Sequence, residues 1–297
     1  AAILLIYGFV LIRQIFSANT KFSEEKVYVY APTGSDYEAV KKLISPYVED
    51  MQRFELVAGK TSYPENVKSG RFLLKNGMSS YDLVKTMRIN DPVKLAFNNQ
   101  ERLENLAGRV GSQLEPDSLS LLTTFKDSTF LKENGFTEDN VFVMLIANTY
   151  EVYWNITAEK FRDKMIKEYR TFWNEKRTQQ AAQQGLTPVT ATILASIVHK
   201  ESIKKDERPR IAGVYLNRMK QGMPLQADPT VIFALKKKSN DFNQVIKRVF
   251  YNDLFLNSPY NTYKNIGLPP GPIAMPDITA LEAVLAPEKH NYLYFCA

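Results

Sequence analysis

The residue whose position best suits acid–base chemistry is Glu201. It follows Leu194 by seven positions, Ile197 by four and Val198 by three, which are the same-face spacings of an α-helix. The spacing therefore predicts a carboxylate on the apolar stripe of a helix. Apolar surroundings disfavour a charged carboxylate, so we expect the pKa of Glu201 to lie above its usual value. A carboxyl group that stays protonated near neutral pH can serve as a general acid.

The helix that carries Glu201 has a clear start. Thr187 has the side chain of an N-cap, and Pro188 suits the first helical position. Periodicity alone leaves a second interpretation of Glu201 open, in which it forms a structural ion pair with a buried arginine such as Arg208 or Arg218.

Polar residues cluster downstream of this helix. Asp228-Pro229 precedes an apolar helix, so Asp228 has a structural interpretation as an N-cap as well as a functional one. The Gly/Pro-rich segment 258–276 has few accessible conformations and can hold polar groups in place. Amides, hydroxyls and aromatic rings with few charges suit a neutral polyol ligand. The candidate substrate-binding residues are Asn217, Gln226, Asp228, Thr230, Tyr260, Asn261, Thr262 and Tyr263.

Composition excludes several other chemistries. The chain has two histidines, His199 and His290, and one cysteine, Cys296, so no His-rich or Cys/His zinc site and no intrachain disulfide is expected. No G-x-S-x-G motif accompanies the histidines. The net charge of +6 is mild and spread over mixed-sign segments, which argues against a nucleic-acid partner. The one local basic cluster, residues 236–238, fits an exposed loop or a contact with an anionic surface.

The segments before residue 187 predict α/β structure and then helices. Residues 26–31 and 71–74 have strand composition, and each precedes a helical pattern, at 35–43 and after Ser79. We expect two β–α pairs in a small module. A strand at 92–97 and helices near 99–110, 116–125, 139–146 and 158–180 follow. The aromatic segment Thr149–Trp154 fits a packed connector or a platform for sugar rings.

The first residues are apolar, with no charge before Arg13. A spanning helix needs roughly 20 apolar residues, and this run is shorter, but it begins without a methionine. Three interpretations compete: a truncated membrane anchor, a signal-peptide remnant and a buried helix. We expect the anchor, at 1–18, with the chain after Thr20 on one side of the membrane.

The segments LASIVHKES, RPRIAGVYLNRMKQGMPLQADPTVIFAL and SPYNTYKNIGLPPGPIAMP, with YLYF near the end, occur in one order between Leu194 and Phe295. This order resembles the endolytic murein transglycosylase family, also called MltG or YceG-like. The resemblance implies an α+β fold: an N-terminal membrane helix, a small LysM-like α/β module at 26–91, and a mainly helical catalytic domain with short strands at 92–297. Family members usually continue with a further stretch beyond Ala297.

The resemblance also implies a reaction. The family cleaves the β-1,4 bond between N-acetylmuramic acid and N-acetylglucosamine in nascent peptidoglycan strands, and leaves 1,6-anhydromuramic ends that terminate elongation. Its catalytic glutamate is the second Glu of E-K-E-[ST], which here is Glu201. The first Glu of that motif is His199, and the Thr that commonly precedes D-P-T is Ala227. One glutamate suffices because the 6-hydroxyl of the muramic acid is the nucleophile, so no metal or cofactor is expected.

Two other functions are compatible with the sequence. Glu201 and Asp228 could form the carboxylate pair of an inverting glycoside hydrolase. A wall-binding scaffold without catalysis could use the LysM-like module and the aromatic loops. As partners we expect peptidoglycan glycan strands, the membrane and the machinery of cell-wall synthesis. The expected location is the bacterial cytoplasmic membrane, with the catalytic domain facing the periplasm or the wall.

Overall fold

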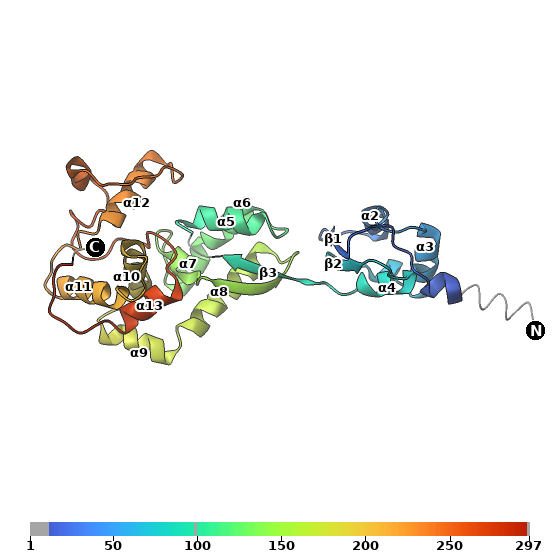
Figure 1. Ribbon diagram of the computed structural model, residues 1–297, viewed down its shortest axis with the longest axis horizontal. Helices are drawn as coiled ribbons and strands as arrows, with labels where there is room; N and C mark the ends of the chain where they lie inside the picture. Colours follow the sequence, from blue (N-terminus) through green and yellow to red (C-terminus); the bar gives the residue numbers. More distant parts are fainter. Residues whose placement is uncertain (1–11, 98–99, 296–297) are drawn as a thin grey trace, which may run out of the picture. The chain divides into compact units, whose positions relative to one another are not determined.

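The computed structural model describes residues 12–97 and 100–295 and divides the chain into two compact units (Figure 1). The N-terminal unit comprises residues 1–95, 113–116 and 150–157. The C-terminal unit comprises residues 96–112, 117–149 and 158–297. Both contain helices and short strands, so the described part of the chain is α+β.

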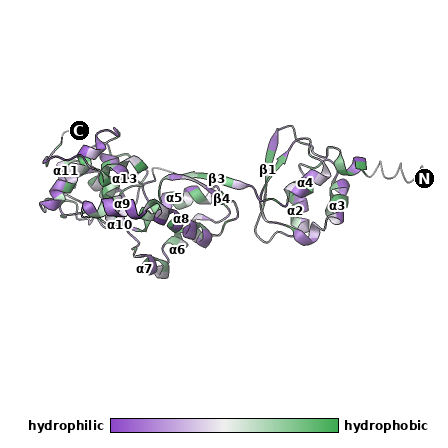
Figure 2. Ribbon diagram, turned by 90° about the horizontal axis from the view of Figure 1, so that it is seen from below, coloured by the Kyte–Doolittle hydropathy of each residue, from purple (hydrophilic) through white to green (hydrophobic). Residues whose placement is uncertain are grey.

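The N-terminal unit is built on a two-stranded antiparallel sheet. Strand β1 (Lys26–Ala31) pairs with β2 (Gly70–Lys75), with Lys26 opposite Lys75. Alternate residues point inward, and Val29 and Phe72 are buried. Helices α2 (Tyr37–Ile44), α3 (Met51–Lys60) and α4 (Ser80–Thr86) complete the core, with the 3₁₀ turn η1 (Pro64–Asn66) between α3 and β2. These helices carry both hydrophobic and hydrophilic residues in Figure 2, as helices that cover a core with one face must.

The two predicted strands and the helices after each of them are confirmed, but the module contains one more helix than predicted. Helix α3 lies between α2 and β2, and the side chain of Asp50 caps it by accepting from the Arg53 N–H at 3.1 Å. Phe54, Val57 and Ala58 are its buried residues, at helical spacing. The helical spacing of these three residues is visible in the sequence, but the polar residues between them make the pattern weak.

The predicted membrane helix at 1–18 is wrong for the residues that can be tested. Across residues 12–97 and 100–295, every helix is too short or too polar to cross a membrane. Residues 1–11 of the predicted anchor lie outside the described residues. Residues 12–16 are helical, and the side chains of Ile12 and Phe16 are exposed.

The first part of the C-terminal unit is mostly helical. Strands β3 (Pro92–Phe97) and β4 (Asn148–Tyr153) form a second two-stranded sheet. The aromatic segment around residue 150 is thus largely a strand. The other elements are α5 (Leu103–Gly111), α6 (Ser118–Phe125), α7 (Ser128–Asn134), the 3₁₀ turn η2 (Val141–Met144), α8 (Ala158–Phe172) and α9 (Glu175–Gln183).

Two helix predictions in this region need correction. The segment 139–146 forms only η2, because Leu145 already has an extended backbone. The long helix predicted at 158–180 is interrupted, because the Asn174 side chain accepts from the Arg177 N–H at 3.0 Å and starts a new helix, α9. An N-cap inside a continuous amphipathic pattern is a strong local signal that periodicity does not reveal.

Helix α10 (Pro188–Glu201) is the centre of the C-terminal unit. It packs against α9, α11 (Arg208–Lys220), α12 (Asp228–Ser239) and α13 (Ile278–Leu285) (Figure 1). The 3₁₀ turn η3 (Tyr251–Phe255) contacts α12. Residues 191–198 of α10 are all buried, so this helix is covered on every side rather than on one stripe. A helix of this kind gives its final residue a fixed position in the fold.

The start of α10 is the predicted one. Thr187 accepts from the Thr190 N–H at 3.2 Å, and Thr190 Oγ1 accepts from the Thr187 N–H at 2.8 Å. This reciprocal arrangement satisfies two N–H groups that have no partner inside the helix. Pro188 follows at the first helical position.

We expect Thr187→Ala to lower the free energy of unfolding of the C-terminal unit by about 1 kcal/mol, because an alanine leaves the N-cap bond unmade. The chain has two tryptophans, and Trp173 lies in the C-terminal unit while Trp154 lies in the N-terminal one. Urea unfolding followed by fluorescence in a Trp154→Phe background therefore reports on the correct unit. Thr187→Ser is the matched control and should keep most of the stability. An equal loss in both variants would contradict the capping role.

Candidate active site

Glu201 is the last residue of α10, at the edge of the buried helix bundle. Its side chain is half-buried, and Oε2 accepts a hydrogen bond of 3.1 Å from the hydroxyl of Tyr215 on α11. Tyr215 itself is buried. The carboxylate thus lies between a packed interior and the surface, where a ligand can reach it.

The surroundings of Glu201 favour its protonated form. Burial is the main cause and raises the pKa of Glu201; the hydrogen bond from Tyr215 lowers it, and the charge of Asp228 raises it again. The net pKa lies above the usual value, in the direction that the helical spacing predicted. The C-terminal end of a helix also carries partial negative charge, which disfavours a second negative charge there.

The ion pairs considered for Glu201 are formed elsewhere. Arg208 is paired with Asp277, with nitrogen and oxygen 2.8 Å apart. Arg218 donates to two backbone carbonyls, those of Leu225 at 2.7 Å and Leu293 at 2.6 Å. Among the described residues, the hydrogen-bonding partner of the Glu201 carboxylate is therefore a neutral hydroxyl rather than a cation. No ion pair with these two arginines therefore offsets the effect of burial, which raises the pKa of Glu201.

Asp228 and Tyr263 belong to the same polar cluster as Glu201. The Tyr263 hydroxyl donates to Asp228 Oδ1 at 2.6 Å. Burial raises the pKa of Tyr263 most, and this hydrogen bond and the charges of Asp228 and Glu201 raise it further. Asp228 is exposed, and it is the first residue of α12. The N-cap is Ala227, which has no capping side chain. The carboxylate of Asp228 is thus not used to cap the helix and faces the site.

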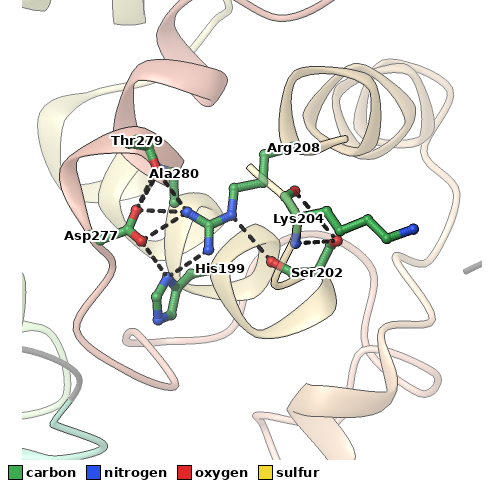
Figure 3. A network of polar contacts seen from close by, with 7 residues as sticks. All are labelled: His199, Ser202, Lys204, Arg208, Asp277, Thr279 and Ala280. Atoms are coloured by element: carbon green, nitrogen blue, oxygen red, sulfur yellow. Dashed lines mark hydrogen bonds and ion pairs between the residues drawn. The ribbon is translucent and has the colours of Figure 1, made fainter. Parts of the chain in front are cut away.

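A buried arginine fixes the backbone around Glu201 (Figure 3). Arg208 Nε donates to the carbonyl of Ser202 at 3.2 Å, and Nη1 donates to Asp277 and to Thr279 Oγ1, at 2.8 and 2.6 Å. Ser202 directly follows Glu201, Arg208 begins α11, and Asp277 is the N-cap of α13. One guanidinium therefore ties together the ends of three helices next to the candidate acid.

Electrostatics keep this network charged. Partial burial raises the pKa of Asp277, but hydrogen bonds from Arg208, Thr279 and the Ala280 N–H outweigh it and hold the pKa at about 2. His199 Nδ1 lies 3.4 Å from Asp277 Oδ2 and 3.4 Å from Arg208 Nη2. Burial lowers the pKa of His199, and Asp277 offsets part of that effect. His199 thus takes part in the arginine network; residues two apart on a helix do not face each other, so it points away from Glu201.

Several predicted binding residues hold the loops in place instead of offering free polar groups. Thr230 and Thr262 are buried, and their hydroxyl oxygens lie 2.8 Å apart. Thr230 Oγ1 also donates to the Ala227 carbonyl at 2.7 Å. Asn261 is buried, and its amide donates to the carbonyls of Leu254 and Leu256 at 2.9 and 2.8 Å. These groups position the residues on either side of them.

The other predicted residues are spread over the unit. The Asn217 amide donates to the carbonyls of His290 and Tyr292, at 2.8 and 3.0 Å, and so binds the C-terminal segment to α11. The hydroxyl of buried Tyr260 donates to Asp139 Oδ1 at 3.1 Å. Gln226 is exposed beside Asp228, with a left-handed backbone (φ 52°). The structure therefore groups Asp228 and Tyr263 with Glu201 and places Asn217 and Tyr260 in other contacts.

Sequence reasoning missed two parts of the site. Tyr215 was not among the predicted site residues, although it is the donor to Glu201. Asp277 was not singled out, although it anchors Arg208. Tyr215 has no local motif that marks it, and the N-cap signal of Asp277 does not reveal its contact with Arg208. In residues 12–97 and 100–295 no group of three or more His, Cys, Asp or Glu side chains is placed to hold a metal ion.

Comparison with known proteins matches residues 29–297 to the model of the YceG-like family. This chain belongs to the YceG-like family. The endolytic murein transglycosylase of Bacillus subtilis (strain 168) is 28% identical over 98% of this chain and 83% of the relative. That of Streptococcus pneumoniae serotype 2 (strain D39) is 27% identical over 93% of this chain, which spans 55% of that relative.

A solved structure extends the likeness from sequence to fold. The crystal structure of a protein described as YceG-like, from Listeria monocytogenes, shares 29% sequence identity with this chain. It superposes with a TM-score of 0.60 and covers 93% of this chain and 94% of the other. The YceG-like fold therefore includes both units of the chain.

We expect Glu201→Gln to stabilise this YceG-like chain at neutral pH. Because the folded state raises the pKa of Glu201, its favourable contribution is present below the unfolded pKa and is lost as pH rises through the folded pKa. Glutamine is neutral throughout and avoids that loss. The free energy of unfolding of the variant, measured in urea, should exceed that of the parent at pH 7 and approach it near pH 4.

Glu207→Gln is the matched control, for which we expect the opposite change in the free energy of unfolding. Hydrogen bonds from Lys204 and Ser202 lower the pKa of Glu207, so its contribution is present at neutral pH and is lost as pH falls. This variant should be the less stable one at pH 7 and converge with the parent in acid. A Glu201→Gln chain that is less stable than the parent at pH 7 would show that burial does not control Glu201.

Proposed function

We propose that this chain is an endolytic murein transglycosylase in which Glu201 is the catalytic acid and base. The observation that supports this role most directly is the half-buried carboxyl of Glu201, which has a raised pKa and a hydroxyl, not a cation, as its partner. Family membership and the names of the relatives support the reaction class.

The proposed reaction needs one carboxyl group. Protonated Glu201 donates its proton to the glycosidic oxygen between N-acetylmuramic acid and N-acetylglucosamine while the bond from that oxygen to the muramic C1 breaks. The resulting carboxylate takes the proton from the muramic 6-hydroxyl, whose oxygen bonds to C1. The products are a 1,6-anhydromuramic end and a free N-acetylglucosamine 4-hydroxyl, and Glu201 is again protonated. A raised pKa serves the first step, and the regained proton closes the cycle.

In this mechanism the residues beside Glu201 stabilise the positive charge that develops at C1 of the muramic acid. Asp228 is exposed beside Glu201 and is held by the Tyr263 hydroxyl, so its carboxylate can stabilise an oxocarbenium-like transition state. Tyr215 orients the Glu201 carboxyl from the buried side. Gln226, with its exposed side chain, is available to orient the sugar.

A second candidate, an inverting glycoside hydrolase, is favoured by one observation. Asp228 is close enough to Glu201 for its charge to raise the pKa of Glu201, so two carboxylates flank the same space. In an inverting hydrolase the second carboxylate activates a water molecule, and the product carries a reducing end. The chemical nature of the new ends separates the two reactions.

We propose that the enzyme acts outside the cytoplasm on nascent glycan strands and terminates their elongation, in contact with the machinery of wall synthesis. In this proposal residues 26–91 form a LysM-like module that helps to hold the strand, and residues 92–297 form the catalytic domain. The compact sheet-and-helix core of the N-terminal unit is consistent with an independent binding module.

We expect Glu201→Gln to reduce strand cleavage roughly a hundredfold or more, the usual effect of removing a general acid–base group. Purified glycan strands are digested, and mass analysis of the ends gives both rate and product. The parent chain should yield anhydro ends, and reducing ends would favour the hydrolase instead. Glu207→Gln, a nearby carboxylate outside the site, is the control and should retain activity. Full activity of Glu201→Gln would refute the catalytic assignment.

We expect Tyr215→Phe to shift the alkaline limb of the kcat/KM profile to higher pH. The Tyr215 hydrogen bond lowers the pKa of Glu201, so its removal raises that pKa further and extends the pH range in which the acid is protonated. Tyr169→Phe, a buried tyrosine on α8, is the matched control and should leave the profile unchanged. A limb that stays in place in Tyr215→Phe would show that Glu201 does not control it.

A further inference from the structure

A groove lies along helix α12 within the C-terminal unit, and it is made of two adjoining cavities of about 510 and 530 Å³. Glu101, Phe233 and Phe242 line both cavities, so the cavities lie next to each other. We refer to them together as the α12 groove. None of its lining has a part in the acid–base chemistry proposed above.

One end of the α12 groove lies one residue away from the candidate active site on each of two helices. Lys200 on α10 and Pro229 on α12 line this end, and their chain neighbours are Glu201 and Asp228, which lie outside the lining. Glu101 forms its wall and is fixed there by ion pairs with Lys200 at 2.9 Å and with Lys236 at 2.8 Å. Lys236 is buried. The wall carries one carboxylate tied to two lysines, so a ligand that enters the groove meets a preformed surface of net positive charge.

The other end combines an aromatic floor with charges of both signs. Phe142, Phe233 and Tyr260 form the floor. On the rim, Lys126 pairs with Glu104 at 3.0 Å and Lys237 pairs with Asp139 at 3.1 Å, and Glu138 adds a further carboxylate. The ligand that matches this lining carries carboxylates, an amine and small apolar groups within a short length.

The rim ion pairs can exchange partners at little cost. The side chains of Lys126 and Glu104 are 36% and 39% exposed, and those of Lys237 and Asp139 are 50% and 46% exposed. Exposed pairs contribute little to stability because water competes for both partners. A carboxylate of the ligand can therefore replace Glu104 or Asp139, and an amine can replace a lysine.

We propose that the α12 groove binds the stem peptide attached to the muramic acid residue at which the strand is cut. This inference rests on the proposed function, and it names a second recognition element of the same substrate. A stem peptide carries α-carboxylates, alanine methyl groups and, in its diamino acid, an amine. These groups match the lysines, the aromatic floor and the carboxylates of the far end.

The distances allow this placement. The muramic ring must lie beside Glu201, and its peptide leaves from the lactyl group of that ring. From Pro229 to Lys237, α12 rises about 12 Å at 1.5 Å per residue. An extended peptide of five residues spans roughly 17 Å. The peptide can thus reach the charged rim while the sugar remains at the site.

Paired substrates test the proposal. Glycan strands that bear uncross-linked stem peptides are compared with the same strands after an amidase has removed the peptides. The parent chain should have the higher kcat/KM on the peptide-bearing strands. Lys126→Gln and Lys237→Gln should each lower kcat/KM on these strands by about fivefold, the upper end for one partly exposed ion pair, mainly through KM. Cleavage of stripped strands should not change.

Lys132→Gln is the matched control, because Lys132 is an exposed lysine of the same unit on α7, outside the groove. It should behave as the parent on both substrates. Equal losses on both substrates in the two groove variants, or a parent that cuts both substrates equally well, would overturn the proposal.

A binding measurement separates this proposal from the proposed function. The probe is the free pentapeptide L-Ala-γ-D-Glu-L-Lys-D-Ala-D-Ala, with a second arm that carries diaminopimelate in place of lysine, titrated into the Glu201→Gln chain by calorimetry. Saturable binding that Lys126→Gln or Lys237→Gln weakens supports the groove even if no strand is cut. Absence of binding in both arms, with cleavage by the parent intact, would refute the groove and leave the transglycosylase standing.

Discussion

The contacts of the buried Arg208 guanidinium hold together the end of the C-terminal unit that carries Glu201. The guanidinium joins Ser202, the residue after Glu201, to Asp277, the N-cap of α13. Arg208 is also the first residue of α11. An arginine suits this position because its planar fork can bind a carbonyl and a carboxylate in different directions at once. Removal of Asp277 would leave a buried cation without its partner, which is far costlier than the loss of a surface pair. His199 enlarges this network rather than the site of Glu201.

Glu201 illustrates how stability and reactivity oppose each other. Burial at the end of α10 raises the pKa of Glu201 and so favours the protonated carboxyl group, and the same burial makes the ionised form unfavourable for folding. The rest of the unit must supply the stability that this residue does not. Helix α10 does so, because residues 191–198 are buried on all sides and its first turn is capped reciprocally.

The loops beyond α11 serve the site indirectly. Their amide and hydroxyl residues resemble ligand-binding groups in the sequence, but several of them bond to the backbone of the same loops. Thr230 and Thr262 join the start of α12 to the Gly/Pro-rich segment, and Asn261 closes the turn before it. This scaffold presents Asp228 and Tyr263 beside Glu201 and lets α12 form one wall of a charged groove.

Local signals in the sequence determined the strands β1, β2 and β3, helix α10 with its Thr187 cap, and a carboxylate at its end, because pattern and capping depend on residues only a few positions apart. They did not reveal the break before α9 or the surroundings of Glu201. Tyr215, 14 positions away, and Asp277, 69 positions from Arg208, meet their partners only when α11 and α13 pack against α10. Tertiary structure decided these contacts, since no local periodicity specifies which distant side chains share a buried space.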